Sequence, residues 1–162
     1  MFDEHDIPQD MINRYAYTGL VPQHQNAIVR IINGAHKVFL GGTCNESDWR
    51  ERLIPLLKIR YFNPVVEDWT EECFQREMEE KESADYQLFV ITPLMTGVFS
   101  IAEVVDCSNK CPEKAVFCFI TEDGGKTFDE GQIKSLTKVG EMVENNGGKF
   151  VRNFDQLPDV LI

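Results

Sequence analysis

The chain has 162 residues, 43% of them hydrophobic, and its 16 Lys and Arg against 27 Asp and Glu give a net charge of −11 at pH 7. This length and composition predict one folded domain and exclude wholesale disorder, and no stretch approaches the roughly 18 apolar residues of a membrane-spanning helix. The acidic charge repels phosphate polymers and anionic lipid, so DNA, RNA or membrane binding is not expected, whereas a single nucleotide held by backbone N–H groups remains compatible with it.

The N-terminus and the cysteines predict a cytoplasmic protein. Residues 1–6 are acidic and lack the apolar core of a secretory signal. The five cysteines are odd in number and lack framework spacing, which is typical of reduced thiols: Cys44, Cys73, Cys107, Cys111 and Cys118. Cys107 and Cys111 are expected to be two half-buried thiols. No metal site is expected, because the histidines have no partners at ligand spacing: His5, His24 and His36.

The first 35 residues differ from the rest of the chain. Residues 1–35 form a polar extension in which the segment 25–32 predicts one short helix ended by Gly34. From His36 onward, apolar runs of strand length alternate with segments of helical period. The sequence therefore predicts an N-terminal extension over 1–35 and one domain over 36–162.

The domain begins with a buried strand and a helix. The run 37–40 is mainly apolar and a pair of glycines closes it, a pattern typical of a strand buried on both faces. Ser47 or Asp48 is expected to cap the following helix, which Pro55 should kink or shorten. The apolar face of that helix consists of Trp49, Leu53, Leu56 and Leu57.

Further strands and helices follow in alternation. Strands are expected over 59–62, 86–91 and 115–120, and a short strand over 149–151 ends the pattern. The residues that define the intervening helices are Phe74 and Met78 after a cap at Thr70 or Glu71; Ile101, Val104 and Val105 after a cap at Ser100; and Ile133, Leu136, Gly140 and Val143 before a stop at 146–148.

This alternation determines the expected fold class. Strands separated by helices pair in parallel through right-handed crossovers, which predicts an α/β three-layer sandwich with about five parallel strands. The simplest arrangement is flavodoxin-like, with strand order 2-1-3-4-5. Ligands of such sheets bind beyond the carboxyl ends of the strands, at the switch point between the first and third. The loops 41–47, 63–70 and 92–100 are therefore expected to form one cleft.

The first two loops contain candidate binding residues. Gly41 and Gly42 would let the backbone approach a ligand, and the following helix offers free N–H groups, although a tight strand-to-helix turn explains the pair equally well. The loop matches neither the dinucleotide fingerprint nor the P-loop. In the second loop, Trp69 beside Asp68 would suit stacking of a nucleobase, or would simply pack on the adjoining helix.

The third loop leads to a candidate catalytic residue. Glu103 follows Ser100 by three residues, where a capping box places a glutamate. The same position directs a carboxylate toward the predicted cleft, near backbone N–H groups that keep it ionised, as a nucleophile requires. Glu77, beside Phe74 and Met78 on the preceding helix, could supply a second carboxyl group.

These segments resemble a known family. The segments 39–43 and 48–53, then Asn63-Pro64 and 67–69, are similar to the nucleoside 2-deoxyribosyltransferase-like family. The resemblance continues through Phe74, Glu77, 84–85 and 100–103, and covers residues 38–120. It implies a member of a superfamily that includes transferases and nucleoside 5′-monophosphate N-hydrolases.

The resemblance implies cleavage or transfer at an N-glycosidic bond without a cofactor. Glu103 would attack C1′ and form a glycosyl-enzyme, with Glu77 as acid or base-orienting group. Gly41, Gly42 and Thr43 would hold the sugar or a 5′-phosphate, and Asp68 with Trp69 would border the base. The loops add a further set of candidate substrate-binding residues: Asn45, Thr96, Gly97 and Ser100. The resemblance also implies a homodimer or larger homo-oligomer.

One departure keeps other functions open. The related transferases carry an aspartate six residues before the nucleophile, where this chain has Gly97. A non-catalytic nucleotide-binding or interaction module on the same fold is therefore an alternative, as is a glycohydrolase that cleaves an NAD-type dinucleotide. The sequence leaves four features of the reaction open: whether the sugar is ribose or deoxyribose, whether a 5′-phosphate is needed, which base is released, and whether water or a second base is the acceptor.

Overall fold

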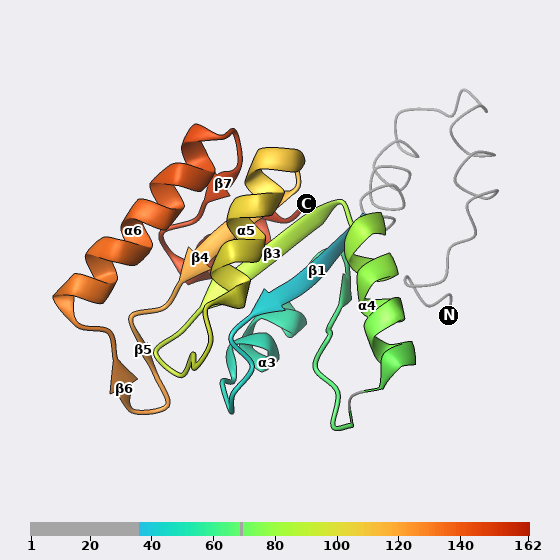
Figure 1. Ribbon diagram of the computed structural model, residues 1–162, viewed down its shortest axis with the longest axis horizontal. Helices are drawn as coiled ribbons and strands as arrows, with labels where there is room; N and C mark the ends of the chain where they lie inside the picture. The colour runs from blue at the N-terminus through green and yellow to red at the C-terminus, as the bar shows by residue number, and fades with distance from the viewer. Residues whose placement is uncertain (1–35, 69) are drawn as a thin grey trace, which may run out of the picture.

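The computed structural model describes residues 36–68 and 70–162. The extension 1–35, with its expected helix over 25–32, and Trp69 lie outside the described residues. The central sheet has five strands, all parallel, in the order β2-β1-β3-β4-β7 (Figure 1). These strands are β1 (Lys37–Gly42), β2 (Arg60–Phe62), β3 (Tyr86–Ile91), β4 (Ala115–Phe119) and β7 (Lys149–Phe150).

The strand order confirms the predicted α/β fold of flavodoxin-like order, with β7 as the fifth strand of the sheet. β1 pairs with β2 on one side and β3 on the other: Val38 lies opposite Tyr61 and Tyr86. The connections after β1 and after β2 therefore lead to opposite sides of β1 in the sheet. This makes the carboxyl ends of β1 and β3 the switch point of the sheet.

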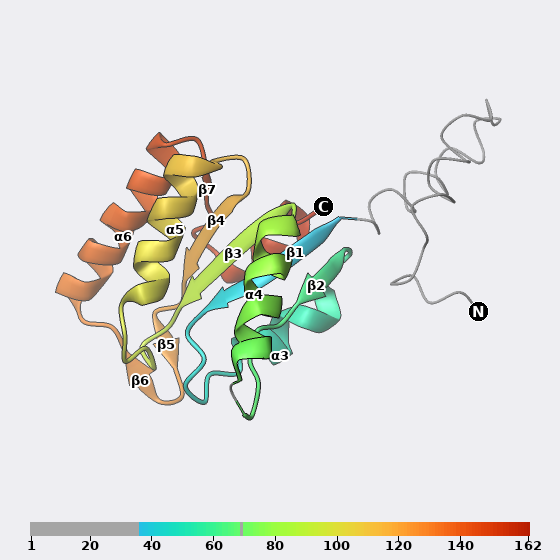
Figure 2. The same cartoon turned by 45° about the vertical axis from the view of Figure 1, so that its right-hand side comes forward.

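Helices cover both faces of the sheet (Figures 1 and 2). On one face lie α4 (Glu71–Ser83), α5 (Phe99–Lys110) and α6 (Glu130–Asn145), and on the other lie α3 (Trp49–Leu53) and α7 (Leu157–Val160). Alternate residues of β1 enter the two cores: Val38 and Leu40 pack with Trp49 of α3, whereas Phe39 belongs to the core beneath α5 and α6. None of the helices in the described ranges has the length and apolar content to cross a bilayer.

Pro55 shortens the second predicted helix, as expected. α3 ends at Leu53, and the 3₁₀ helix η1 (Ile54–Leu56) continues the chain with the proline in its first turn. The tighter turn rotates Leu56 away from the core, where it is 57% exposed, although the helical spacing had placed it on the buried face.

The predicted cap at Ser100 is wrong. α5 begins at Phe99 after Val98, whose carbonyl accepts from the N–H groups of Ile101 and Ala102, and no side chain caps this end. The helix closes its first turn before Ser100, so Glu103 lies in the second turn and is no capping-box glutamate. The predicted cap at Thr70 is confirmed, because its hydroxyl accepts from Cys73 N–H at 3.2 Å.

A two-stranded hairpin follows β4 and was not predicted. β5 (Glu122–Asp123) pairs antiparallel with β6 (Lys126–Thr127), and Gly124 and Gly125 form the turn with positive φ. Asp123 is buried and accepts a short hydrogen bond from the Ser47 hydroxyl, which ties the hairpin to the loop after β1. The Gly124-Gly125 pair is a preferred two-residue hairpin turn and could have predicted this hairpin.

Gly42 makes the close approach of β1 to β3 possible. Its φ is +113°, and a Cβ there would lie 2.1 Å from the Val90 carbonyl oxygen. The next residue, Thr43, donates its N–H to the same oxygen at 2.9 Å. The backbone at the end of β1 therefore admits no side chain at position 42.

We expect Gly42→Ala to lower the free energy of unfolding by about 2–4 kcal/mol, because strain at positive φ and a backbone clash act together. Urea denaturation measures the change. Gly97→Ala is the matched control: its φ lies outside the left-handed region and nothing lies within 4 Å of an added Cβ. We expect the control to change the free energy of unfolding by less than about 1 kcal/mol. Equal destabilisation of both variants would contradict the prediction.

Candidate active site

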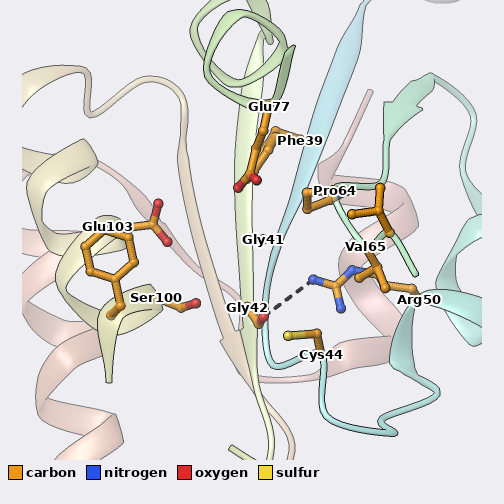
Figure 3. A pocket seen from close by; sticks show the side chains of 12 residues that line it. Phe39, Gly41, Gly42, Cys44, Arg50, Pro64, Val65, Glu77, Ser100 and Glu103 are labelled. Atoms are coloured by element: carbon orange, nitrogen blue, oxygen red, sulfur yellow. Dashed lines mark hydrogen bonds between the residues drawn. The ribbon is translucent and has the colours of Figure 1, made fainter. Parts of the chain in front are cut away.

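A cleft of about 340 Å³ opens at the carboxyl end of β1, between α4 and the start of α5. Its lining comes from β1, from the three loops that the sequence indicates and from the helices that follow them, α3, α4 and α5 (Figure 3). Figure 3 shows Glu103 and Ser100 of α5 on one wall and Arg50, Pro64 and Val65 on the other. The volume lies within the range of small-molecule sites.

Two carboxylates enter this cleft from neighbouring helices. Glu77 projects from α4 and Glu103 from α5, and both side chains point into the same space (Figure 3). Burial raises the pKa of Glu77, the negative charge of Glu103 raises it further, and the positive charge of Lys81 lowers it. Glu77 therefore retains its proton to a higher pH than an ordinary glutamate does.

Glu103 forms an ion pair with Lys81. The Lys81 Nζ lies 2.5 Å from Oε1 of Glu103, and both side chains are about one-fifth exposed. Lys81 follows Glu77 by four residues on α4, so the two side chains occupy one face of that helix. The facing helices thus provide one carboxylate bound to a cation and one carboxyl group whose pKa is raised.

Arg50 is a buried cation on the opposite wall of the cleft. Its guanidinium donates to the carbonyls of Leu40 at 2.9 and 3.1 Å and of Thr43 at 2.8 Å, and more weakly to that of Gly42 at 3.5 Å. Burial lowers its pKa to about 10, which leaves it charged at neutral pH. It stacks over the Trp49 ring. Arg50 therefore fixes the end of β1 and places a positive charge beside the cleft.

A smaller cavity of about 160 Å³ adjoins the cleft and shares Gly42, Cys44, Phe99 and Ser100 with it. Four other predicted binding residues lie around this cavity rather than the cleft itself: Thr43, Asn45, Thr96 and Gly97. The Thr43 hydroxyl accepts from Thr92 N–H at 3.0 Å. Asn45 donates to Thr96 Oγ1 at 2.8 Å, which joins the first loop to the third.

The structure does not bring every predicted residue into the cleft. Asp68 is exposed and lies outside the lining of both cavities, and Trp69 lies outside the described residues. The sequence reasoning assigned no role to Arg50, Lys81, Cys44 or Phe99. Arg50 falls inside the segment 48–53, which carries the resemblance, and Lys81 follows Glu77 by one helical turn. The positions of both residues in the sequence could therefore have indicated a role in the site. Phe99, 75% exposed at the start of α5, had none.

Cys107 and Cys111 lie at the far end of α5 from the cleft opening. Their Sγ atoms are 3.4 Å apart, and Cys107 is buried. Burial, and then a hydrogen bond with Cys111, raises the pKa of the Cys107 thiol to about 12. Over 36–68 and 70–162, no three His, Cys, Asp or Glu side chains group so as to hold a metal ion.

The family described as "Nucleoside 2-deoxyribosyltransferase like" matches residues 35–122. This range is more than half of the chain and contains every residue that lines the cleft. The chain matches no curated protein.

The charges around Glu77 predict opposite pKa changes in two variants. We expect Glu103→Gln to lower the Glu77 pKa, because it removes a negative charge that raises it, and Lys81→Met to raise it, because it removes a positive charge that lowers it. Carboxyl ¹³C NMR titration of Glu77 measures both. Glu144, whose pKa is lowered mainly by a hydrogen bond from Arg152, is the internal control and should not move. Shifts of the same sign in the two variants would refute this electrostatic account.

We expect Arg50→Met to lower the free energy of unfolding by about 2–4 kcal/mol, because the substitution removes the guanidinium donors to the buried Leu40 carbonyl and leaves the Thr43 carbonyl with the Trp49 indole N–H alone among its side-chain donors. Arg52→Met is the matched control on the same helix: that side chain is 47% exposed and 3.8 Å from Asp48, so less than about 1 kcal/mol is expected. Chemical denaturation compares the two. A loss in Arg50→Met no larger than in Arg52→Met would show that the carbonyl contacts contribute little.

Proposed function

The chain belongs to the nucleoside 2-deoxyribosyltransferase-like family, and we propose that it cleaves or transfers the N-glycosidic bond of a nucleoside or nucleotide. The observation that carries the proposal is the pair of carboxylates in one cleft: Glu103 beside a cation and Glu77 with a raised pKa. Environments that make two carboxyl groups differ in this way suit a nucleophile and an acid.

In the first step, Glu103 attacks C1′ of the sugar. A bond forms between a carboxylate oxygen and C1′ while the bond from C1′ to the base nitrogen breaks, and the bonding pair goes to the base. Glu77 donates its proton to the base, which leaves as a neutral molecule. The raised pKa of Glu77 supports this role, because it increases the fraction that holds a proton near neutral pH.

In the second step, water or another base attacks C1′ and displaces the carboxylate of Glu103. The bonding pair returns to the carboxylate oxygen, and Glu77 accepts the proton that the nucleophile releases. This sequence is the two-carboxylate scheme of retaining glycosidases. It needs no cofactor. Hydrolysis and transfer differ only in which acceptor enters the cleft.

The walls of the cleft suggest how a substrate would lie. Pro64, Val65 and Val66 give an apolar surface on one side, and the exposed Phe99 ring lies at the start of α5 on the other. Such surfaces suit a flat nucleobase. We assign the sugar to the end of β1, at Gly41 and Gly42 beside Glu103. The adjoining 160 Å³ cavity then takes the 5′ end, with or without phosphate.

The scheme gives a role to five residues around the 160 Å³ cavity, which would hold the 5′ end: Thr43, Asn45, Thr96, Gly97 and Ser100. We also propose that the protein forms a homo-oligomer. Asp68 keeps its proposed place near the base only if the ligand extends beyond the described cleft.

The proposal is tested by chromatographic assay of free base. We expect the protein to release or exchange a base from at least one member of a panel of ribonucleosides, deoxyribonucleosides, their 5′-monophosphates and NAD. Glu103→Gln should abolish this activity, because an amide is no nucleophile for C1′. Glu79→Gln is the control, since it makes the same change of charge at an exposed position of α4.

The rate of base release should fall as the pH rises through the raised pKa of Glu77, because the acid loses its proton.

Activity retained in Glu103→Gln would contradict the assignment of the nucleophile. A wild-type protein that is silent across the panel but is stabilised by one of its members would instead favour a non-catalytic binding module. At a ligand concentration one hundred times the dissociation constant, that stabilisation is about 2.7 kcal/mol.

A further inference from the structure

We infer that Lys81 is a positioning residue for the reaction proposed above: it holds Oε1 of Glu103 so that Oε2 attacks C1′, and it stabilises the carboxylate released in the second step. The inference rests on the proposed function, in which Glu103 is the nucleophile. It adds a residue that acts on the nucleophile from behind, without contact with the substrate.

Lys81 lies on the far side of Glu103 from the cleft. A second cavity, of about 420 Å³, extends between α4 and α5, and Lys81 lines this cavity but not the cleft. Glu103 lines both. The ion pair therefore separates two spaces, with the carboxylate facing the substrate side and the ammonium behind it.

The environment of Lys81 fixes the position of its ammonium group. The Nζ lies 5.8 Å from the centre of the Phe39 ring and 5.6 Å from that of Phe89, distances at which aromatic faces attract a cation. The Lys81 carbonyl accepts from the Gln87 side-chain amide at 3.0 Å, which anchors this turn of α4 to β3. A cation held in this way is already in place before the reaction begins.

The two oxygens of Glu103 differ as a result. Oε1 accepts from Lys81 at 2.5 Å, whereas no described residue donates a hydrogen bond to Oε2. The free oxygen is the one available to form a bond with C1′. In the glycosyl-enzyme the carboxylate has become an ester without charge, and its charge returns when the bond from C1′ to Oε2 breaks. A cation beside Oε1 therefore stabilises the free carboxylate relative to the ester.

No other cation in the described part of the chain is placed to replace Lys81. Lys110 lines the same cavity but pairs with Asp106 at 2.8 Å. The remaining charged neighbours of Glu103 around the two cavities are Glu77 and Glu82 of α4 and Arg50 across the cleft. Since two of these three are acidic, removal of Lys81 exposes the ionised Glu103 to repulsion and favours the ester.

The test compares Lys81→Met, Lys81→Arg and Lys110→Met on the substrate that the base-release assay identifies. At saturating substrate and acceptor, we expect Lys81→Met to lower kcat on the order of 10²-fold. KM should fall together with kcat, because slower release of the sugar makes the glycosyl-enzyme accumulate, whereas kcat/KM should change little because Lys81 does not line the cleft. Intact-protein mass spectrometry of quenched reactions should show a sugar adduct that accumulates in Lys81→Met above its level in the wild type. Peptide mass spectrometry after digestion should place this adduct on the peptide that contains Glu103.

Lys81→Arg should restore most of the activity, and Lys110→Met should behave like the wild type. Thermal unfolding checks that each variant is folded, and Lys81→Gln replaces the methionine variant if that one is not. A folded Lys81→Met or Lys81→Gln protein with unchanged kcat, or with low kcat and no extra adduct, overturns the inference. Glu103→Gln, run alongside, separates the two hypotheses: retained activity there refutes the nucleophile itself. A wild type without base release overturns both.

Discussion

The geometry of the site depends on how β1 ends. Arg50 donates to the carbonyls of Leu40 and Thr43 just where β1 leaves the sheet, and Thr43 in turn exchanges hydrogen bonds with Val90 and Thr92 at the end of β3. These contacts keep the two strand ends in register while the chain turns away from them. Because β1 and β3 define the switch point, this one arrangement fixes both the floor of the cleft and the starting points of its loops.

The depth of the two cleft carboxylates follows from the direction of the helices. α4 and α5 each connect the carboxyl end of one strand to the amino end of the next strand, so each helix leads away from the cleft opening. Glu77 and Glu103 lie in the second turn of their helices, below the opening and above the packed core. Lys81 lies one turn deeper. A substrate that enters from the loops therefore meets the carboxylates first, and the cation stays behind them.

Much of the fold was predictable, because each strand is a short apolar run bounded by turn residues. The run 86–91 coincides with β3, and the alternation of strands and helices determined the parallel order. The expected helix at 49–57 was shortened because Pro55 tightened its last turn into a 3₁₀ helix. The start of α5 was misplaced because Ser100, a good capping residue, lies one residue inside a helix that begins without a side-chain cap.

The site was only partly predictable, and the reason is the same for each missed residue. Glu103 could be found because its place after the third strand directs a carboxylate toward the predicted cleft. Glu77 is one of several acidic residues in 67–85, and only the family resemblance distinguished it from the others. Arg50 and Lys81 depend on what a neighbouring element brings to them: one on the carbonyls of β1, the other on a carboxylate 22 residues later in the chain. Periodicity within a segment carries no information on such pairs.

The overall acidity of the chain gives these two cations their importance. With a net charge of −11, a cleft lined by two glutamates would by itself repel an anionic substrate and raise the free energy of an ionised nucleophile. Arg50 and Lys81 flank the pair on opposite sides, one beside the cleft and one behind it. Each is buried or half-buried, so bulk salt screens its field only weakly. Local charge therefore dominates inside the cleft, so the net acidity of the chain does not argue against the nucleoside or nucleotide substrate proposed above.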